Sequence, residues 1–458
     1  MAKPPRMVIC REQQCRRAGI FAVMAMQPEH ENTAMWDMKT SEANTGTKIP
    51  DGNLGTNKTQ PSCTNRRSKT MATTAEGDFL WGATMQARAR KLLLEYQERY
   101  VAANPKSADS FGRASVSLAG GNTRSVLHYD PFPMVLVSGR DCFVSSEDGR
   151  EYVDFVSEYS ACMLGHSHPA VAEAVQAVMS RGINLGGASK EEQVLAALLT
   201  ERIPSMARVR FCNSGTEANT MALTLARHHT GRRKILAFEN GYHGGFIGFD
   251  SGVLPTTVPF EFVLARYDDA THVRELVDDS FAAIIVEPMQ GVAMDPPALG
   301  GSTSSAQQQR LSHSGTFNNN AFSMTAGAVA CRLITREAIA RANALGDRLR
   351  EGITAAGRNA EASPWMWASG FGSMLNVHFG GFAAAELRDL FFFFMLDRGF
   401  YVSRRGLIAL NLMHTDHHNS RSSSRHSSLV YKIEVLYLMQ FFAITMFRNQ
   451  KLILVSYS

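Results

Sequence analysis

The sequence VRFCNSGTEANTMALTLAR, residues 209–227, carries the strongest indication of the fold. It begins with a short apolar run, VRFC, which predicts a strand that ends at Cys212. A tight turn of Ser214, Gly215 and Thr216 follows at once, and a helix is predicted from about Thr216 onward. A strand that turns directly into a helix is the unit from which helix-covered parallel sheets are built.

Strands and helices alternate on both sides of this stretch. Two further apolar runs, KILAF (234–238) and AAIIVEP (282–288), predict strands of the same sheet. Upstream, residues 169–182 and 190–202 predict helices, the second with Ser189 at its N-cap. This alternation predicts an α/β fold with a mostly parallel sheet and helices on both faces.

Changes of pattern divide the chain into six segments. They are a disordered N-terminal tail (1–75), an N-terminal helix with its connection (76–140), a large domain (141–300), a polar linker (301–314), the remainder of the large domain with a small C-terminal α+β domain (315–412), and an unassigned tail (413–458). The other predicted elements are a helix at 82–102, a hairpin that turns at Asp148-Gly149, helical sequence over 326–356, a strand at 373–379, a helix at 384–398 stopped by Gly399, and a strand at 401–412.

The composition is that of an ordinary globular protein, with 45% hydrophobic and 19% charged residues. The net charge of +5 is not gathered into one stripe, so no nucleic-acid partner is predicted.

Seven cysteines without a CxxC pair indicate reduced thiols and a cytoplasmic location, with a mitochondrial presequence left open. The apolar stretch 429–447 is interrupted by Lys432 and Glu434, so no membrane span is predicted. The histidines near the C-terminus lack supporting carboxylates, so no metal site is predicted.

The turn of Ser214, Gly215 and Thr216 has the features of a phosphate site. Amide N–H groups at a helix start have no partner within the helix and lie at the positive end of its dipole. Gly215 permits close approach of the backbone, and Thr216 adds a hydroxyl donor. The alternative is that the serine and threonine only cap a helix.

Two further strand ends carry polar or aromatic residues. Tyr242, in ENGYHGGFIG (239–248), follows KILAF, and Glu287 and Gln290 end the strand at 282–288. Ligands bind at the carboxyl edge of parallel sheets, where Tyr242 is placed to stack on a planar ring. The alternatives are that the Tyr-His pair fills the core and that Glu287 is a structural hydrogen-bond centre.

Ordered motifs make the chain resemble class III aminotransferases, and glutamate-1-semialdehyde aminomutases in particular. The motifs are GHSHP (165–169), NSGTEA (213–218), GYHG (241–244), VEPMQG (286–291), and GTFNNN with SMTAG (315–327). The resemblance covers about residues 110–300 and 315–412. It implies a fold-type-I transferase that uses pyridoxal phosphate (PLP) and transfers an amino group.

The resemblance also assigns roles to residues. Gly215 and Thr216, beside Ser214, are implied to hold the cofactor phosphate. Tyr242 is implied to stack on the pyridine ring and His243 to lie beside it. The predicted cofactor site therefore consists of Ser214, Gly215, Thr216, Tyr242, His243, Glu287, Gln290 and Thr316.

Two residues are implied to act beyond the cofactor. Thr316 resembles a phosphate ligand that reaches in from the second subunit of a homodimer. Arg124, in GGNTRSV, resembles the arginine that binds the carboxylate of a small amino or oxo acid. The alternative for Arg124 is a solvated loop residue.

Two parts of the family's chemistry do not occur in the sequence. The family places an aspartate for the pyridine nitrogen and a lysine for the Schiff base in the interval that here runs from Gly291 to Gly315. Asp295 is the only acid in this interval, and no lysine stands between Lys234 and Lys432. The sequence therefore predicts that sheet elements, as well as the catalytic lysine, have been lost.

Two readings of function follow. In the first, the chain is an aminotransferase or aminomutase. In the second, it is a non-catalytic PLP-binding or dimerisation partner that retains the phosphate site. A nicotinamide-dependent dehydrogenase is not supported, because no GxGxxG follows a first strand.

Overall fold

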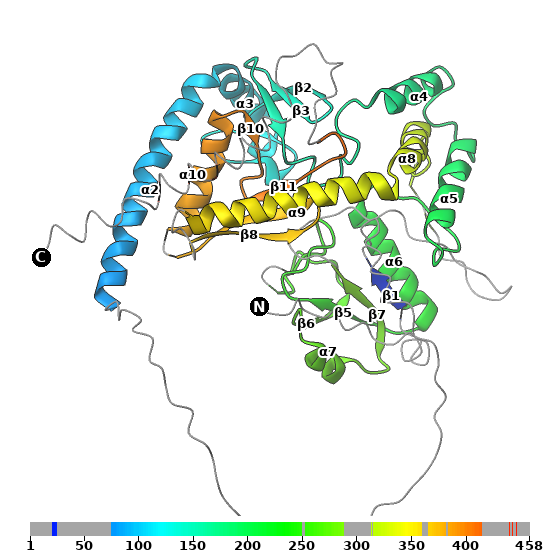
Figure 1. Ribbon diagram of the computed structural model, residues 1–458. Helices are drawn as coiled ribbons and strands as arrows, with labels where there is room; N and C mark the ends of the chain where they lie inside the picture. The colour runs from blue at the N-terminus through cyan, green and yellow to red at the C-terminus, as the bar shows by residue number, and fades with distance from the viewer. Residues whose placement is uncertain are drawn as a thin grey trace, which may run out of the picture.

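The computed structural model describes residues 21–24, 75–249, 252–287, 313, 315–359, 365–381, 383–414, 439, 442 and 446 (Figure 1). The predicted polar linker, apart from His313, and most of the predicted C-terminal tail lie outside these residues.

One of the three sheets is four-stranded and parallel. Its strands are β1 (Phe21–Met24), β5 (Lys234–Phe238), β6 (Glu261–Ala265) and β7 (Phe281–Val286), in the order β1-β7-β5-β6. Every neighbouring pair is parallel, as the sequence predicts. The predicted strands at 234–238 and 282–288 are confirmed, whereas β6 is absent from the prediction.

Helices cover both faces of this sheet. On one face, Ile235 and Ala237 pack against α6 (Gly215–Thr230). On the other face, Leu236 packs in a cluster that includes residues of α7 (Ala270–Leu276). Full burial of an isoleucine or leucine side chain, such as Ile235 or Leu236, contributes roughly 1.5–3 kcal/mol. The predicted two-sided cover of the sheet is therefore confirmed.

Strand β1 comes from the segment for which the sequence predicts disorder. It runs parallel to β7, with Phe21 opposite Ala283 and Met24 opposite Val286. An isolated four-residue apolar run has no periodic context, so the sequence gives no sign that it pairs with β7, which begins more than 250 residues further along the chain. The edge of β7 is thereby paired.

The predicted strand at 209–212 is wrong. These residues have no regular structure, and Val209 and Phe211 instead pack against a cluster between α5 (Lys190–Arg202) and α8 (Ala321–Leu333). A strand forms only where a neighbour pairs with its N–H and C=O groups. Among the described residues, no strand of the sheet pairs with this segment.

A helical layer lies beside the sheet (Figure 1). It contains α4 (Pro169–Met179), which packs on α8, as does α5. The N-cap of α5 is confirmed, since Ser189 Oγ accepts from Glu192 N at 3.1 Å.

The helical sequence predicted over 326–356 forms two helices, α8 and α9 (Arg336–Asn359). Thr335 separates them and caps the second, because its Oγ1 accepts from Ala338 N at 3.2 Å.

Two helices, α2 (Ala75–Ala103) and α3 (Pro105–Ser117), are the next described elements after β1. The short 3-10 turns η2 (Ala119–Gly121) and η3 (Ser125–Leu127) follow them. The predicted helix at 82–102 is confirmed as part of α2.

An antiparallel sheet follows these helices. It consists of β2 (Leu136–Arg140), β3 (Phe143–Ser146) and β4 (Glu151–Asp154), with β10 (Phe400–Tyr401) added parallel to β4. The hairpin predicted at Asp148-Gly149 is confirmed, and Gly149 supplies the positive φ of 84° that its turn requires.

A third sheet has the order β11-β9-β8, formed by β8 (Met366–Phe371), β9 (Met374–Phe379) and β11 (Leu407–Ala409). The strand predicted at 401–412 is thus divided between two sheets as β10 and β11, with a turn between them.

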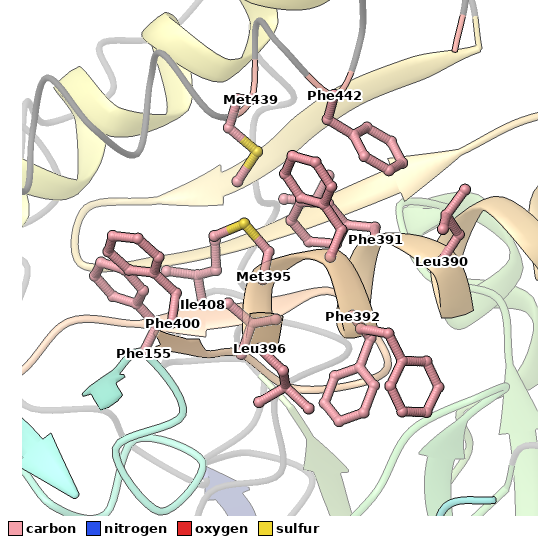
Figure 2. Close-up of a cluster of buried hydrophobic side chains, with 14 of the residues drawn as sticks. Phe155, Leu390, Phe391, Phe392, Met395, Leu396, Phe400, Ile408, Met439 and Phe442 are labelled. Atoms are coloured by element: carbon pink, nitrogen blue, oxygen red, sulfur yellow. The ribbon is translucent and has the colours of Figure 1, made fainter. Parts of the chain in front are cut away.

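The largest hydrophobic core surrounds α10 (Ala384–Asp397). All four phenylalanines at 391–394 are buried, because α2, β9 and β10 contact this helix and Phe442 packs against two of the rings (Figure 2). The stretch from Phe391 to Leu396 is apolar on every side of the helix and must be enclosed in this way. Its predicted stop is confirmed, with Gly399 at φ 81°.

Within the described ranges, no helix combines the length and the apolar character needed to cross a bilayer.

Candidate active site at the sheet edge

The carboxyl ends of β5 and β7 lie at one edge of the parallel sheet. The loop that follows β5 folds back on itself, with a bridge between Tyr242 and Gly248. His243 N donates to Ile247 O at 2.7 Å and closes the tip of this loop. The sequence GYHGGFIG is therefore a compact structure at the edge where the sequence predicts a ligand site.

The start of α6 is capped from both directions. Ser214 Oγ accepts from Glu217 N at 3.1 Å, and Glu217 Oε2 accepts from Asn213 N at 2.7 Å. Ser214 therefore does cap the helix, which is the alternative role that the sequence allowed for it. The first amides of the helix, at Gly215 and Thr216, have no acceptor within the helix and remain suited to an anion.

Thr216 joins the helix start to the loop after β5. Its Oγ1 accepts from Gly245 N at 2.9 Å. A Cβ on Gly244 would lie 2.5 Å from the same oxygen and 2.7 Å from Thr216 Cα, and Gly244 has a φ of +131°. Only glycine satisfies both conditions, so the loop and the helix start form one close-fitting cradle.

His243, which directly precedes Gly244, is 2% exposed. Neither ring nitrogen has a hydrogen-bond partner in the described part of the chain. Burial lowers the pKa of His243 to about 4, so the imidazole is neutral near pH 7. Its backbone O accepts from Asn219 Nδ2 at 2.8 Å, and Asn219 Oδ1 is likewise buried without a partner there. Such orphaned polar atoms usually mark a missing ligand or water.

Glu287 directly follows β7, is 5% exposed, and accepts a hydrogen bond from the loop that contains Tyr242. Its Oε2 accepts from Tyr242 N at 3.1 Å, and Tyr267 Oη accepts from Glu287 N at 3.3 Å. Burial and the charge of Glu287 raise the pKa of Tyr267 to about 12. Glu287 therefore fixes the backbone of Tyr242, whose own side chain is 46% exposed and free to face a ring.

The GTFNNN segment meets the same helix start. Asn213 Nδ2 donates to Asn318 Oδ1 at 2.6 Å, and Asn318 Nδ2 lies 3.2 Å from His313 Nε2. Thr316 itself is exposed, and Asn184 Nδ2 donates to its backbone O. The GTFNNN segment therefore contacts the start of α6 within the same chain.

Sequence reasoning did not single out Asn213, Asn219, Gly244 or Asn318. Three of them lie inside NSGTEA, GYHG or GTFNNN, so the motifs located them without assigning a role. Their roles depend on contacts between segments more than 20 residues apart, which no local pattern reports. Gln290 lies outside the described residues.

Arg124 belongs to a different group of residues. Its Nη1 donates to Glu158 Oε2 at 2.7 Å, and its guanidinium lies over the Tyr159 ring at 5.9 Å. This hydrogen bond raises the pKa of Arg124 further above its ordinary value. Both partners of the ion pair are about half exposed.

Glu158 and Tyr159 lie on an unusual turn. Four successive residues, Ser157 to Ser160, have φ values between 43° and 80°, which is a full left-handed turn without glycine. Each such residue costs about 1–2 kcal/mol relative to right-handed backbone. Other contacts must therefore stabilise this turn.

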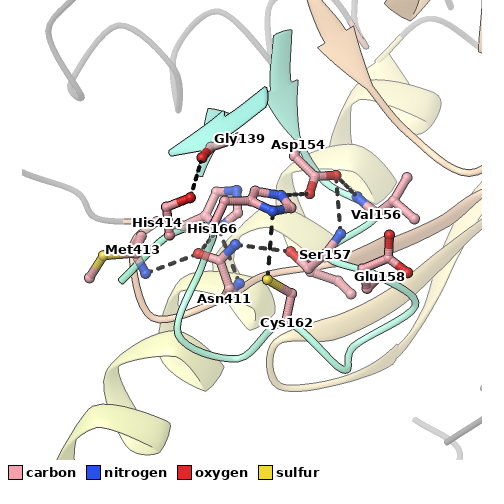
Figure 3. A network of polar contacts seen from close by, with 12 residues as sticks. Gly139, Asp154, Val156, Ser157, Glu158, Cys162, His166, Asn411, Met413 and His414 are labelled. Atoms are coloured by element: carbon pink, nitrogen blue, oxygen red, sulfur yellow. Dashed lines mark hydrogen bonds and ion pairs between the residues drawn. The ribbon is translucent and has the colours of Figure 1, made fainter. Parts of the chain in front are cut away.

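A polar network provides those contacts (Figure 3). Asp154 Oδ1 accepts from Val156 N at 2.8 Å and Ser157 N at 3.1 Å, and Asp154 Oδ2 lies 2.7 Å from His166 Nε2. Ser157 Oγ donates to Ala409 O at 2.9 Å. The hydrogen bond to Asp154 raises the pKa of His166. His166 belongs to the GHSHP motif, and its contact with Asp154 could not be read from that motif.

The described lysines lie away from the cradle. Lys91 and Lys106 are on α2 and α3, and Lys190 begins α5. Lys234 begins β5, at the amino end of the strand, with its Nζ 5.6 Å from the centre of the Phe281 ring. A phosphate and a planar ring fit the edge, but covalent attachment of an aldehyde to a lysine finds no support there. Asp295 lies outside the described residues.

Among the described residues, no group of three histidine, cysteine or carboxylate side chains is arranged to hold a metal ion.

The neutral state of His243 predicts a loss of stability in acid. The unfolded chain takes up a proton near pH 6.5, whereas the folded chain does so only near pH 4. The unfolding free energy is therefore expected to fall by about 2 kcal/mol between pH 7 and pH 5 through this residue. Urea unfolding of the cofactor-free protein at both values measures it. His243→Gln should remove this part of the pH dependence, and equal slopes for both proteins would contradict the assignment.

Comparison with known proteins agrees with these features. The family described as aminotransferase class III matches residues 126–251. The β-phenylalanine transaminase of Variovorax paradoxus is 36% identical over 402 residues, covering 71% of this chain and 92% of that protein. The glutamate-1-semialdehyde 2,1-aminomutase of Methanothermobacter thermautotrophicus is 36% identical over 201 residues, covering 41% of this chain and 48% of that protein.

The solved structure of a β-phenylalanine aminotransferase from Variovorax paradoxus superposes with a TM-score of 0.69 at 32% identity, covering 77% of this chain and 97% of that one. The longer sequence match is thus to a transaminase, while the aminomutase matches over about half of its length. Both the sequence and the fold agree over nearly the whole length of the transaminase, and the chain therefore belongs to the class III aminotransferase family.

Proposed function

We propose that this chain binds PLP at the carboxyl edge of its parallel sheet and that its function lies in amino-group transfer. The observation that carries the proposal is the cradle of Thr216 and Gly244, which joins a helix start to the loop of an exposed tyrosine. When bound, PLP supplies an aldehyde that condenses with amines and a ring that accepts electrons.

The residues at the edge divide the task of binding. The first amides of α6 and the Thr216 hydroxyl suit the phosphate, because both present donors at the positive end of the helix. Tyr242 offers a ring face for stacking, on a backbone fixed by Glu287. The ring nitrogens of His243 and the side-chain oxygen of Asn219, which have no partner among the described residues, are available to the polar atoms of the cofactor or to water held with it.

Three further assignments belong to the proposal. Gln290, which follows β7 in the sequence, serves as a further cofactor-binding residue. Thr316 acts on the phosphate of a second subunit in a homodimer, which is supported by its exposure. Arg124 binds the carboxylate of a small amino or oxo acid. The substrate carboxylate either replaces Glu158 as the partner of the guanidinium or binds beside it.

The lack of disulfides among the four described cysteines agrees with a reducing compartment, and we propose a cytoplasmic location.

A second candidate function is favoured by the distribution of lysine. With no lysine from 235 to 431, the chain could retain the cofactor and yet lack the group that exchanges protons in amino-group transfer. In that case it acts as a binding protein or as a partner in a dimer with a complete enzyme.

Two measurements on the purified full chain test the proposal. Titration with PLP, followed by absorbance and tyrosine fluorescence, is expected to show saturable binding that inorganic phosphate weakens. A transamination assay with β-phenylalanine as donor and an oxo acid as acceptor then separates the two candidates. Absence of saturable binding contradicts both of them.

A further inference from the structure

Cys162, His166 and Asp154 form a chain of side-chain contacts away from the sheet edge, which we call the Cys162 triad (Figure 3). Cys162 Sγ is 3.8 Å from His166 Nδ1, and His166 Nε2 is 2.7 Å from Asp154 Oδ2. A thiol, an imidazole and a carboxylate in this order have the arrangement of a nucleophile, its base and the group that orients the base. The proposed cofactor site uses none of the three.

The two oxygens of Asp154 have different partners. Oδ1 accepts from the backbone N–H groups of Val156 and Ser157 and so holds the left-handed turn. Oδ2 contacts the imidazole of His166. A carboxylate only accepts hydrogen bonds, so His166 Nε2 carries a proton, and in the neutral ring Nδ1 is then an acceptor. This acceptor is the atom beside the thiol, and stabilising the turn does not require that contact.

The surroundings of His166 fix its position. Its backbone N donates to Asp141 O at 2.7 Å, and its backbone O accepts from Asp141 N at 2.9 Å. A Cβ at Gly139 would lie 2.7 Å from His166 Cγ, so β2 packs directly against the imidazole. A base that is already in place for proton transfer does not have to be ordered during the reaction.

The thiol of Cys162 keeps its proton at neutral pH. Burial and the charges of Asp154 and Glu158 raise the pKa of this thiol to about 11. Cys162 therefore donates to His166 Nδ1 and is not a free thiolate. The serine hydroxyl of a hydrolase triad is also protonated before it reacts, and it attacks because a neutral imidazole takes its proton. Cys162 has the same arrangement for proton transfer.

The availability of this base depends on pH. Besides Asp154 and Cys162, the titratable groups whose charges act on His166 among the described residues are Glu158 and His414. The hydrogen bond to Asp154 raises the pKa of His166, whereas burial lowers the pKa of His414 to about 4, so that His414 is neutral at pH 7. Protonation of His166 removes the acceptor at Nδ1. A reaction at Cys162 that needs this base is thus expected to accelerate as His166 loses its proton and then to level off.

We propose that Cys162 is a reactive thiol that small peroxides oxidise to a sulfenic acid, with His166 as its base and Asp154 as the residue that positions the base. The sulfur attacks one peroxide oxygen, so that an S–O bond forms and the O–O bond breaks. His166 accepts the thiol proton and passes it to the departing oxygen. The sulfur is oxidised by two electrons, and hydrogen peroxide is reduced to one sulfenic oxygen and one water. Cys162 is partly exposed, which suits a reactant of this size.

The test measures the oxidation of individual cysteines in the purified full-length chain. The protein is treated with hydrogen peroxide in the presence of dimedone, which labels sulfenic acids, and labelled peptides are quantified by mass spectrometry. Cys331 is the internal reference, because it is also partly exposed and its thiol has no histidine partner among the described residues. We expect Cys162 to be labelled at least about tenfold faster than Cys331 near pH 7.5.

The pH profile separates base assistance from simple thiol ionisation. Labelling of Cys162 is expected to rise from about pH 6 and to level off above about pH 8, once His166 is neutral. An unassisted thiol with a raised pKa instead continues to gain rate through this range, as we expect for Cys331.

His166→Gln is expected to slow the labelling of Cys162 by about a hundredfold, because glutamine can donate to Asp154 but takes up no proton. His168→Gln, in the same motif, is the matched control and should label Cys162 within about threefold of the parent. Circular dichroism compares the folds of the variants. If His166→Gln does not fold, the plateau in the parent protein decides the question.

Two outcomes overturn the proposal. Labelling of Cys162 no faster than that of Cys331, with a rate that climbs steadily with pH, would show that the imidazole does not act as a base. Equal labelling of the parent and a folded His166→Gln would show the same. The proposal does not depend on cofactor binding, so a failure to bind PLP leaves it unchanged.

Discussion

Replacement of Gly244 by alanine is expected to weaken PLP binding by a factor of about one hundred or more while leaving the protein folded. The new methyl carbon would lie 2.5 Å from Thr216 Oγ1 and 2.7 Å from Thr216 Cα, at a φ of +131°. Relief of this overlap moves the loop away from α6 and separates the Gly245 amide from the Thr216 hydroxyl. The phosphate donors and the Tyr242 loop would then no longer face one ligand.

Fluorescence titration of the variant with PLP measures this effect, and circular dichroism confirms the fold. Gly245→Ala is the matched control, because a Cβ at that position meets no atom within 4 Å. The control should bind PLP within about threefold of the parent. Equal binding by both alanine variants would remove the cradle from the proposed site.

Replacement of Asp154 by alanine should lower the unfolding free energy by about 3 kcal/mol, because it leaves two buried amides and His166 without their acceptor. The left-handed turn from Ser157 to Ser160 loses the carboxylate that holds its first residue. Urea unfolding at pH 7 measures the change. Asp154→Asn, which retains an acceptor oxygen, should cost about half as much.

Glu158→Gln is the control for this prediction. Its ion pair with Arg124 is about half exposed, and such pairs contribute about 0–1 kcal/mol. If the control were as destabilising as Asp154→Ala, the turn would depend on its outer ion pair and not on the buried carboxylate.

The sequence predicted the elements whose signals are local. The N-cap at Ser189, the glycine that ends α10 and the turn at Gly149 depend on neighbouring residues, and the structure contains all three. The strands β5 and β7 were predicted because buried parallel strands are continuous apolar runs. The ordered motifs also identified the family, because their order along the chain is visible without any coordinates.

The tertiary structure alone decided which segments pair. The run at 209–212 resembles a strand in sequence but pairs with no strand among the described residues, while the run at 21–24 pairs with β7. Hydrogen bonding between strands is a property of two distant segments, so neither result can be read from one of them. The contacts of Thr216 with Gly245 and of Glu287 with Tyr242 are non-local in the same way.

The positions of the lysines illustrate what the sequence determines and what the tertiary structure determines. The sequence by itself determined that no lysine stands from 235 to 431, because that is a count. The strand predicted at 234–238 already placed Lys234 at the edge opposite Tyr242, and the structure confirms this position. Only the tertiary structure decided that the Lys234 ammonium lies over the ring of Phe281 in β7, because that contact joins two strands that are far apart in the sequence. The sequence therefore determined which groups the chain possesses, and the packing of the sheet determined which of them can meet.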